Sequence, residues 1–341
     1  MKDELSLIEF SLKFGNHDNC VRCLENIRWP TGIIVCPTCG QSGSYRNLDC
    51  KTYTCKSVKC KSRFGITVGT IMENTKVPLS KWFFMMYMMV LNQKNINAVE
   101  MASYTGVRQK ASWSMMMKIR TLFKQKEGLK FSGTVEIDEC FVSKSHQWKK
   151  MGASSFRKLP VIGMLERNSK RVILKVLPDR KMATIESVVL SHVDTGSTIY
   201  TDGHLSYKNL STWFSHSSVN HSEREYVRGD VHTNGIESAW RVLKSTIRSS
   251  HQSVHFKHLQ TYCDEIAFKI NNRDMKPSDR FRYLLQRAVC GSNNYASITE
   301  GRDNSVAIKP QSPISKSKLV FINEDLADSL NWKNFNTESL M

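Results

Sequence analysis

Clustered cysteines are the first residues in this chain whose types and spacing suggest chemistry. Seven of the ten cysteines lie between positions 20 and 60, a higher density than scattered free thiols would show. Cys36-Pro-Thr-Cys39-Gly predicts a tight turn that brings two thiolates to one ion, and Cys55 and Cys60 supply a second pair. Two such pairs make a tetrahedral ligand set, so we predict one structural Zn²⁺.

A second combination of cysteines stays open. Cys20 and Cys23 also have the spacing of a ligand pair and could join the pair at Cys36. The segment around them reads as a helix that ends before Pro30, which favours the first set.

Three acidic residues form the other candidate site. Asp138 lies in the apolar run VEIDECFV, Asp202 ends the run STIYTD, and Glu237 stands near the start of a predicted helix. The predicted elements around them follow the order strand-strand-strand-helix-strand-helix-strand-helix, which is that of a ribonuclease H-like domain, in which the first and fourth strands are neighbours. The three carboxylates are therefore expected to surround one small volume.

Carboxylates crowded in this way repel one another and are stable as anions only with cations between them. Hard oxygen ligands from few side chains favour Mg²⁺, or Mn²⁺, and two such ions can promote an in-line displacement at phosphorus. Lys244 follows Glu237 by two helical turns and shares its face, where an ammonium can hold a DNA phosphate.

Each acid also has a plainer interpretation. Glu136 and Asp138 alternate with Val135 and Ile137, so Asp138 could be the polar half of a half-buried strand, and Asp202 followed by glycine is a common turn pair. Glu237 lies three residues after Asn234, so the two could form a capping box at the helix start. The three positions taken together favour the metal site.

Periodicity in the first part of the chain predicts helices around a small sheet. Residues 4–28 read as one or two short helices, and 33–70 as the short strands of a zinc ribbon. The segments 97–104 and 108–126, separated by a break that contains glycine, resemble a helix-turn-helix.

The later part predicts a mixed sheet. Three β-rich runs at 135–142, 159–167 and 171–178 suggest an antiparallel meander. A helix at 182–192, a short strand at 197–202, a helical stretch around Tyr207, a strand near Val219 and helices at about 235–250, 256–272 and 277–289 complete the order.

The charge balance favours a nucleic-acid partner. The chain has 341 residues and a formal net charge of +18, and residues 1–130 alone carry 20 basic and 9 acidic residues. Such an excess favours binding of double-stranded DNA, because basic side chains release counterions from phosphates. The alternative for the helix pair is a hairpin that never touches DNA. The candidate DNA-binding residues on one face of its second helix are Arg108, Lys110, Lys118 and Arg120.

Nothing in the sequence predicts a membrane or export segment. The longest apolar run, 82–91, is about half of the ~20 residues needed to cross a bilayer. The N-terminus, MKDELSLIEF, carries acids where a signal peptide has bases. We therefore expect a soluble protein without a membrane partner, with cysteines that serve as thiols or metal ligands.

Several motifs carry a family resemblance. VEIDE, VIGMLER, IYTDGHLSY and VHTNGIESAWRVLKSTIRSSHQSVHFKHLQTYCDEIAFKINNR are similar to the ISXO-type insertion-sequence transposases, whose eukaryotic relatives are the Merlin elements. The likeness begins at the ribbon (CPTCG, YTCKSVKC, FGITVGTIME) and extends to about Arg273. Two features depart from the family: the wider spacing between Cys55 and Cys60, and a loop after Asp138 that contains few glycines.

The resemblance implies a DNA transposase that binds the ends of its element, hydrolyses a phosphodiester with Mg²⁺ and joins the freed end to target DNA. Its catalytic aspartates fall on Asp138 and Asp202, and the third position on Glu237, with Asn234 as the competing residue. A homodimer or higher oligomer is expected, because two element ends must be held together. The resemblance places such a protein in the cytoplasm and nucleoid of a bacterium or in the nucleus of a eukaryote. The alternatives are a stand-alone nuclease or resolvase, and a non-catalytic DNA-binding protein derived from a transposase.

The predicted organisation is a multi-domain α+β chain. N-terminal helices and a zinc ribbon occupy 1–75, a helix-turn-helix-like segment 76–130, a ribonuclease H-like transposase domain 131–292 and a weakly ordered tail 293–341.

Overall fold

The computed structural model describes most of the first 290 residues. The chain divides into two units, Met1–Arg302 and Asp303–Met341. The expected weak order of the tail 293–341 and the glycine-poor loop after Asp138 lie outside the described residues, and the domain boundaries above remain predictions. The described residues are 5–48, 52–91, 95–125, 128, 130–142, 159–220, 223, 225, 227–251 and 254–290.

Two short helices precede a four-stranded ribbon, as predicted. They are α1 (Leu7–Phe14), which begins with a capping box between Ser6 and Glu9, and α2 (His17–Arg28). The Arg28 guanidinium donates to the carbonyl oxygens of Ile66 and Val68 and so ties α2 to the ribbon. The strands form an antiparallel sheet in chain order: β1 (Ile34–Val35), β2 (Ser42–Arg46), β3 (Thr52–Thr54) and β4 (Arg63–Gly65).

An aromatic core joins helices from both ends of the described chain. Phe10 of α1 stacks on Tyr87 with ring centroids 4.3 Å apart, and Phe281 packs edge-on against both rings. The helix that carries Phe281 therefore completes the N-terminal helical group. In the described part of the chain, no helix is long and apolar enough to span a membrane. The helices of this group after α2 are α3 (Leu79–Leu91), α4 (Ala98–Thr105), α5 (Gln109–Arg120) and α9 (Pro277–Cys290).

A five-stranded sheet occupies the later part of the chain and has the strand order β7-β6-β5-β8-β9. The first three strands form the predicted antiparallel meander, and β8 and β9 continue the sheet in parallel with β5. This order is that of a ribonuclease H-like domain, so the predicted fold class is confirmed. The strands are β5 (Thr134–Val142), β6 (Leu159–Glu166), β7 (Arg171–Val176), β8 (Thr198–Asp202) and β9 (Ser215–Val219).

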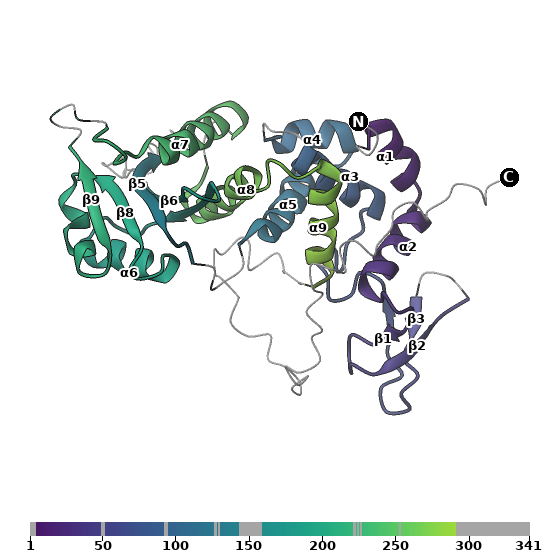
Figure 1. Ribbon diagram of the computed structural model, residues 1–341. Helices are drawn as coiled ribbons and strands as arrows, with labels where there is room; N and C mark the ends of the chain where they lie inside the picture. The colour runs from purple at the N-terminus through teal and green to yellow at the C-terminus, as the bar shows by residue number, and fades with distance from the viewer. Residues whose placement is uncertain are drawn as a thin grey trace, which may run out of the picture. The chain divides into compact units, whose positions relative to one another are not determined.

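Helices cover both faces of this sheet (Figure 1). On one face, Val135 and Ile137 of β5 pack in a cluster with α6 (Met182–His192) and the 3₁₀ helix η3 (Leu205–Thr212). On the other face, Cys140 and Val142 pack with α7 (Asn234–Thr246) and α8 (Leu259–Asn271). Because side chains alternate along a strand, Asp138 points to the face covered by α7. We call this sheet with its helices α6, α7 and α8 the sheet domain.

Candidate active site and metal centre

Asp138 and Asp202 lie beside each other on neighbouring strands. In the parallel pairing of β5 with β8, Glu136 is opposite Tyr200, and the same register carried two residues further sets Asp138 opposite Asp202. Neighbouring strands are about 4.8 Å apart, so the two carboxylates feel each other's charge. Burial raises the pKa of Asp138, the hydrogen bonds from Glu139 and Trp240 lower it, and the charge of Asp202 raises it, so the net effect is upward.

Helix α7 runs alongside β5 in the same direction. Its Ile236 N–H donates to Glu136 Oε2 at 3.0 Å, and one turn later the Trp240 indole N–H donates to Asp138 Oδ2 at 2.9 Å. Another turn on, the charge of Lys244 acts on the buried thiol of Cys140, although burial leaves the pKa of that thiol raised. Successive turns of α7 therefore interact with alternate residues of β5.

Glu237 and Lys244 lie on the same helix as Trp240, which bonds to Asp138. Glu237 stands one turn before Trp240 and is half-buried, and Lys244 is exposed one turn after it. Among the described residues, the three acids are not a set whose ligand atoms all lie within 4.8 Å of one another. Their hard oxygen donors, and the mutual repulsion of Asp138 and Asp202, fit a divalent cation such as Mg²⁺.

The capping interpretation of Glu237 is wrong. The N-cap of α7 is Thr233, no side chain caps the helix from that position, and Asn234 is its exposed first residue. The N–H of Glu237 bonds instead to the Thr233 carbonyl oxygen. The predicted capping box between Asn234 and Glu237 is therefore not formed, which leaves the Glu237 side chain without that role.

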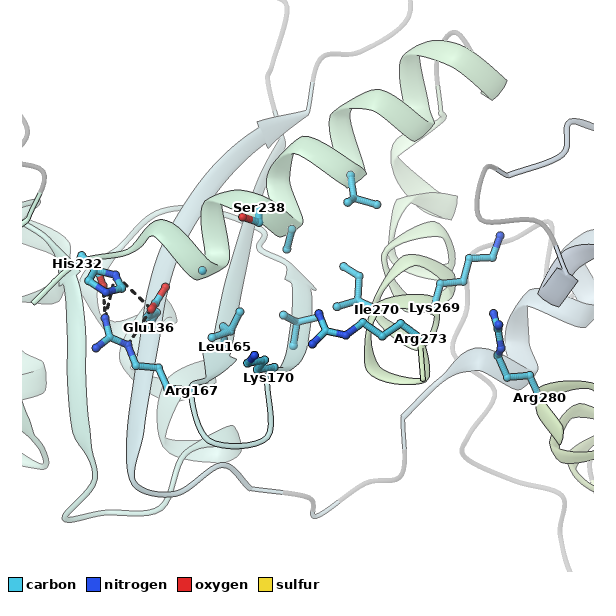
Figure 2. A pocket seen from close by; sticks show the side chains of 14 residues that line it. Glu136, Leu165, Arg167, Lys170, His232, Ser238, Lys269, Ile270, Arg273 and Arg280 are labelled. Carbon is cyan, nitrogen blue, oxygen red and sulfur yellow. Dashed lines mark hydrogen bonds and ion pairs between the residues drawn. The ribbon is translucent and has the colours of Figure 1, made fainter. Parts of the chain in front are cut away.

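The group that accepts a hydrogen bond at the start of α7 is a buried carboxylate from β5 (Figure 2). Glu136, 2% exposed, accepts from Ile236 and pairs with Arg167 Nε at 2.8 Å, and His232 Nδ1 lies 3.5 Å away. A Cβ on Gly235 would lie 2.8 Å from Glu136 Oε2, so a larger residue there would displace this carboxylate. The sequence pattern shows Glu136 only as part of the polar half of a strand. Its partners lie about 30 and 100 positions away, where no local pattern reveals them.

Behind this carboxylate a cavity of about 740 Å³ opens on the side of α7 that faces away from Asp138. Ser238, Ala239 and Val242 of α7 line it, together with Ile270 of α8. Figure 2 shows Lys170 and Arg273 beside its apolar floor. The cavity and the acids thus use different sides of the same helix.

The ribbon brings its four predicted ligands together. The Sγ atoms of Cys36 and Cys60 are 3.9 Å apart, those of Cys39 and Cys55 are 3.5 Å apart, and all four lie within 4.8 Å of one another. A tetrahedral zinc ion with Zn–S bonds of about 2.3 Å needs sulfur atoms about 3.8 Å apart, so the residues fit this metal. The wide spacing before Cys60 does not prevent it from joining the set.

Local backbone geometry positions these sulfur atoms and affects their pKa values. Gly40, with φ of +73°, closes the first turn by donating its N–H to the Cys36 carbonyl oxygen. Burial raises the pKa of Cys36, but backbone N–H groups of Cys39 and Thr38 outweigh it and lower that pKa to about 7. In the second turn, Ser57 N–H donates to Cys55 Sγ at 3.4 Å.

The rival cysteine set is wrong. Cys20 and Cys23 are buried in α2, where the Cys20 thiol donates to the Phe14 carbonyl oxygen at 3.3 Å. Burial raises the pKa of both thiols to about 12. Neither belongs to the four-sulfur cluster in the described part of the chain.

The candidate DNA-binding residues of α5 do not share one exposed face. Arg108 and Lys110 are exposed at the helix start, after the left-handed Gly106 that ends α4. Lys118 is half-buried, with its ammonium 6.0 Å from the centre of the Trp82 ring.

Arg120 is the clear correction to that prediction. Its side chain is buried, 1% exposed, and its Nε pairs with Glu265 of α8 at 2.8 Å. The expectation that Arg120 belongs to an exposed basic face is therefore wrong. Its spacing from Arg108 along the helix could not reveal a partner that lies 145 positions away.

The sheet domain and the four-cysteine ribbon each match a known domain family. Residues 130–271 match the ISXO2-like transposase domain, and residues 15–63 match the transposase zinc-ribbon domain. Both matches are to domains of ISXO-type transposases, so the resemblance seen in the sequence is confirmed.

Individual relatives are distant in sequence. A protein in the transposable element ISH50 of Halobacterium salinarum is 29% identical over 274 residues, which cover 73% of this chain and 89% of the relative. A transposase-like protein of Haemophilus influenzae is 28% identical over 123 residues, 36% of this chain and 96% of the relative. A solved structure, the HTLV-2 integrase catalytic core domain in complex with magnesium, aligns with 15% identity and a TM-score of 0.25 over 42% of this chain and 86% of that chain.

Proposed function

We propose that this chain is an insertion-sequence transposase that cuts and joins DNA with the acids Asp138, Asp202 and Glu237. The observation that carries the proposal is the parallel pairing of β5 with β8, which ends at Glu136 and Tyr200, two positions before Asp138 and Asp202, with Trp240 of α7 bonded to Asp138. The mutual repulsion of the two aspartates supports the binding of a divalent cation at this site.

Each residue has a distinct task in this proposal. Asp138 and Asp202 would hold Mg²⁺, or Mn²⁺, and Glu237 would complete the ligand set from α7. Bound there, such ions lower the pKa of an attacking water and stabilise the leaving oxygen at phosphorus. In the ribbon, Cys36, Cys39, Cys55 and Cys60 hold one Zn²⁺, which would fix the two turns against each other.

A basic stripe on α7 and on the π helix η5 (Ile247–His251) that follows it supports DNA as the substrate. Arg241, Lys244 and Arg248 follow Glu237 by 4, 7 and 11 positions and are exposed on the helix face that it occupies. From Arg241 to Arg248 the stripe extends about 10 Å, far enough to contact neighbouring phosphates of one strand. These three cations would hold the strand beside the acids.

Two further expectations complete the proposal. The exposed Arg108 and Lys110 of α5 bind phosphates of double-stranded DNA at the element ends, in keeping with the net charge of +18. Two ends and a target must meet in one reaction, so the active form is a homodimer or higher oligomer. It acts in the cytoplasm and nucleoid of a bacterium, or in the nucleus if the host is a eukaryote.

Substitution of Glu237 tests the proposal most directly. Glu237→Gln should keep the melting temperature and DNA affinity but lower Mg²⁺-dependent nicking of an element end by about three orders of magnitude, because an amide is a poorer Mg²⁺ ligand. Asn234→Ala is the matched variant and should nick normally, since Asn234 neither caps α7 nor belongs to the proposed set.

The outcomes separate the two candidates for the third ligand. An active Glu237→Gln enzyme together with an inactive, normally melting Asn234→Ala enzyme would transfer that role to Asn234. A wild-type protein that binds the element end and never nicks it with Mg²⁺ or Mn²⁺ would contradict catalysis and leave a DNA-binding protein.

A further inference from the structure

Trp240 occupies a space that a glycine leaves open beneath α7. In the antiparallel pairing of β5 with β6, Asp138 is opposite Gly163. A Cβ on Gly163 would lie 2.5 and 2.6 Å from two ring carbons of Trp240 and 2.7 Å from Ile236 Cδ1. The indole therefore lies directly on the β6 backbone, which no other residue at position 163 would permit.

The same indole holds the carboxylate of Asp138. Its Nε1–H donates to Asp138 Oδ2 at 2.9 Å, and the Trp240 side chain is 5% exposed, so water competes little for this bond. The hydrogen bond favours one rotamer of the Asp138 carboxylate. The position of the indole ring above Gly163 fixes the position of the Nε1–H donor. Asp138 is thus oriented before any cation arrives.

We infer that Trp240, seated on Gly163, is the positioning residue that holds Asp138 in its metal-binding orientation. The inference rests on the proposed function, in which Asp138 is a metal ligand. Trp240 also lies one turn from Glu237 on α7, so one hydrogen bond aligns the first acid with the helix that delivers the third. Groups that orient a metal ligand from behind typically change metal affinity or activity 10–100-fold when removed.

The test is Trp240→Phe in the full-length, zinc-loaded protein. Phenylalanine keeps an aromatic ring on α7 but removes the indole donor together with the far end of the ring over Gly163, and the Trp213→Phe control loses the same atoms. Mn²⁺ affinity, measured by calorimetry on the DNA-free protein, should fall about 10–100-fold, with a parallel rise in the Mn²⁺ concentration needed for nicking. The affinity for DNA and the far-ultraviolet circular dichroism should not change.

The chain offers a matched control. Trp213 donates its indole N–H to Glu186 Oε1 at 2.8 Å, the same kind of bond in a part of the sheet domain that contains none of the proposed ligands. Trp213→Phe should leave Mn²⁺ affinity unchanged. Gly163→Ala should weaken Mn²⁺ binding by a similar factor as Trp240→Phe, because the added methyl displaces the indole, and the double variant should be no weaker than either single one.

Each outcome decides the matter. Wild-type Mn²⁺ affinity in a folded Trp240→Phe protein would overturn the positioning role, as would an equal loss in Trp213→Phe. Mn²⁺ binding that Asp138→Asn abolishes and Trp240→Phe weakens, in a wild-type protein that cuts no DNA, would sustain the positioning role and refute the proposed function.

Discussion

The ribbon and the sheet domain assemble their candidate metal ligands by different routes. In the ribbon, two tight turns between positions 36 and 60 bring four sulfur atoms within 4.8 Å of one another. In the sheet domain, Asp138, Asp202 and Glu237 come from a strand, a strand end and a helix, and their alignment depends on sheet register and on Trp240. The first site is therefore encoded by local turns and the second by the whole domain.

This comparison predicts what each metal does. A ribbon of short strands has little apolar surface to bury, so its metal should supply much of the folding free energy. The acids instead sit on a sheet that is packed on both faces, and their cation should be needed for chemistry alone.

The largest expected effect is therefore loss of zinc from the ribbon. Chelation, or Cys55→Ser with Cys60→Ser, should remove about one zinc ion per chain and with it roughly 10 kcal/mol of apparent binding free energy, so that the ribbon unfolds. Elemental analysis and amide hydrogen exchange would measure both effects. Cys20→Ala with Cys23→Ala is the control and should retain the metal. Zinc that stays bound after loss of Cys55 and Cys60 would contradict the assignment.

At the acid site the next effect is on catalysis and leaves the fold intact. Asp138→Asn should lower nicking by about three orders of magnitude or more. Its melting temperature at pH 7 should equal or exceed that of the wild type, because the pKa of Asp138 is raised by burial and by Asp202.

The sign follows from linkage. A raised folded-state pKa means that the protonated form is favoured in the folded protein, so this contribution to stability is present below the unfolded pKa of about 3.9 and is lost as pH rises through the folded pKa. The neutral amide avoids that loss. The gain in melting temperature should therefore shrink when both proteins are melted near pH 4, and a destabilised Asp138→Asn protein at pH 7 would contradict the comparison.

Proton release gives a smaller but direct contrast between the two sites. Zinc uptake at pH 7 should release about two or more protons per ion, since burial raises the pKa of Cys55 to about 12 and the pKa of Cys60 is also raised. Mg²⁺ uptake at the acids should release fewer than about one, because carboxylates are already ionised at that pH. Calorimetry in two buffers of different ionisation enthalpy would measure both values.

Much of the fold could be predicted because it depends on local pattern. The meander, the helix at 182–192 and the zinc turns follow from apolar alternation, helical spacing and Cys-Pro-Thr-Cys, and the structure contains each of them. The neighbouring positions of Asp138 and Asp202 could also be predicted from strand order, because the strands that carry them pair with each other.

The remaining features depend on partners far along the chain. Glu136 reads as an ordinary strand residue until α7 arrives at its carboxylate, and Arg120 reads as a DNA-binding residue until Glu265 pairs with it. The role of Gly163 is invisible for the same reason, because no turn or positive φ requires a glycine there and only the ring of Trp240 explains it. Tertiary contacts of this kind leave no periodic signal.

The smallest expected effect concerns the proposed contact between the start of α5 and DNA. Arg108 and Lys110 are exposed at the start of α5, and each phosphate contact adds about −0.9 to the slope of log affinity against log salt. Arg108→Ala with Lys110→Ala should therefore reduce that slope by up to about 1.8 and leave the nicking rate at saturating DNA unchanged. Lys118→Ala is the matched control and should not change the slope, because its ammonium is half-buried beside Trp82. Fluorescence anisotropy with an element-end duplex over a range of salt concentrations measures the slope. An unchanged slope in the double variant would remove α5 from the DNA interface, and a lost nicking rate at saturation would mean that these helices act on the acid site itself.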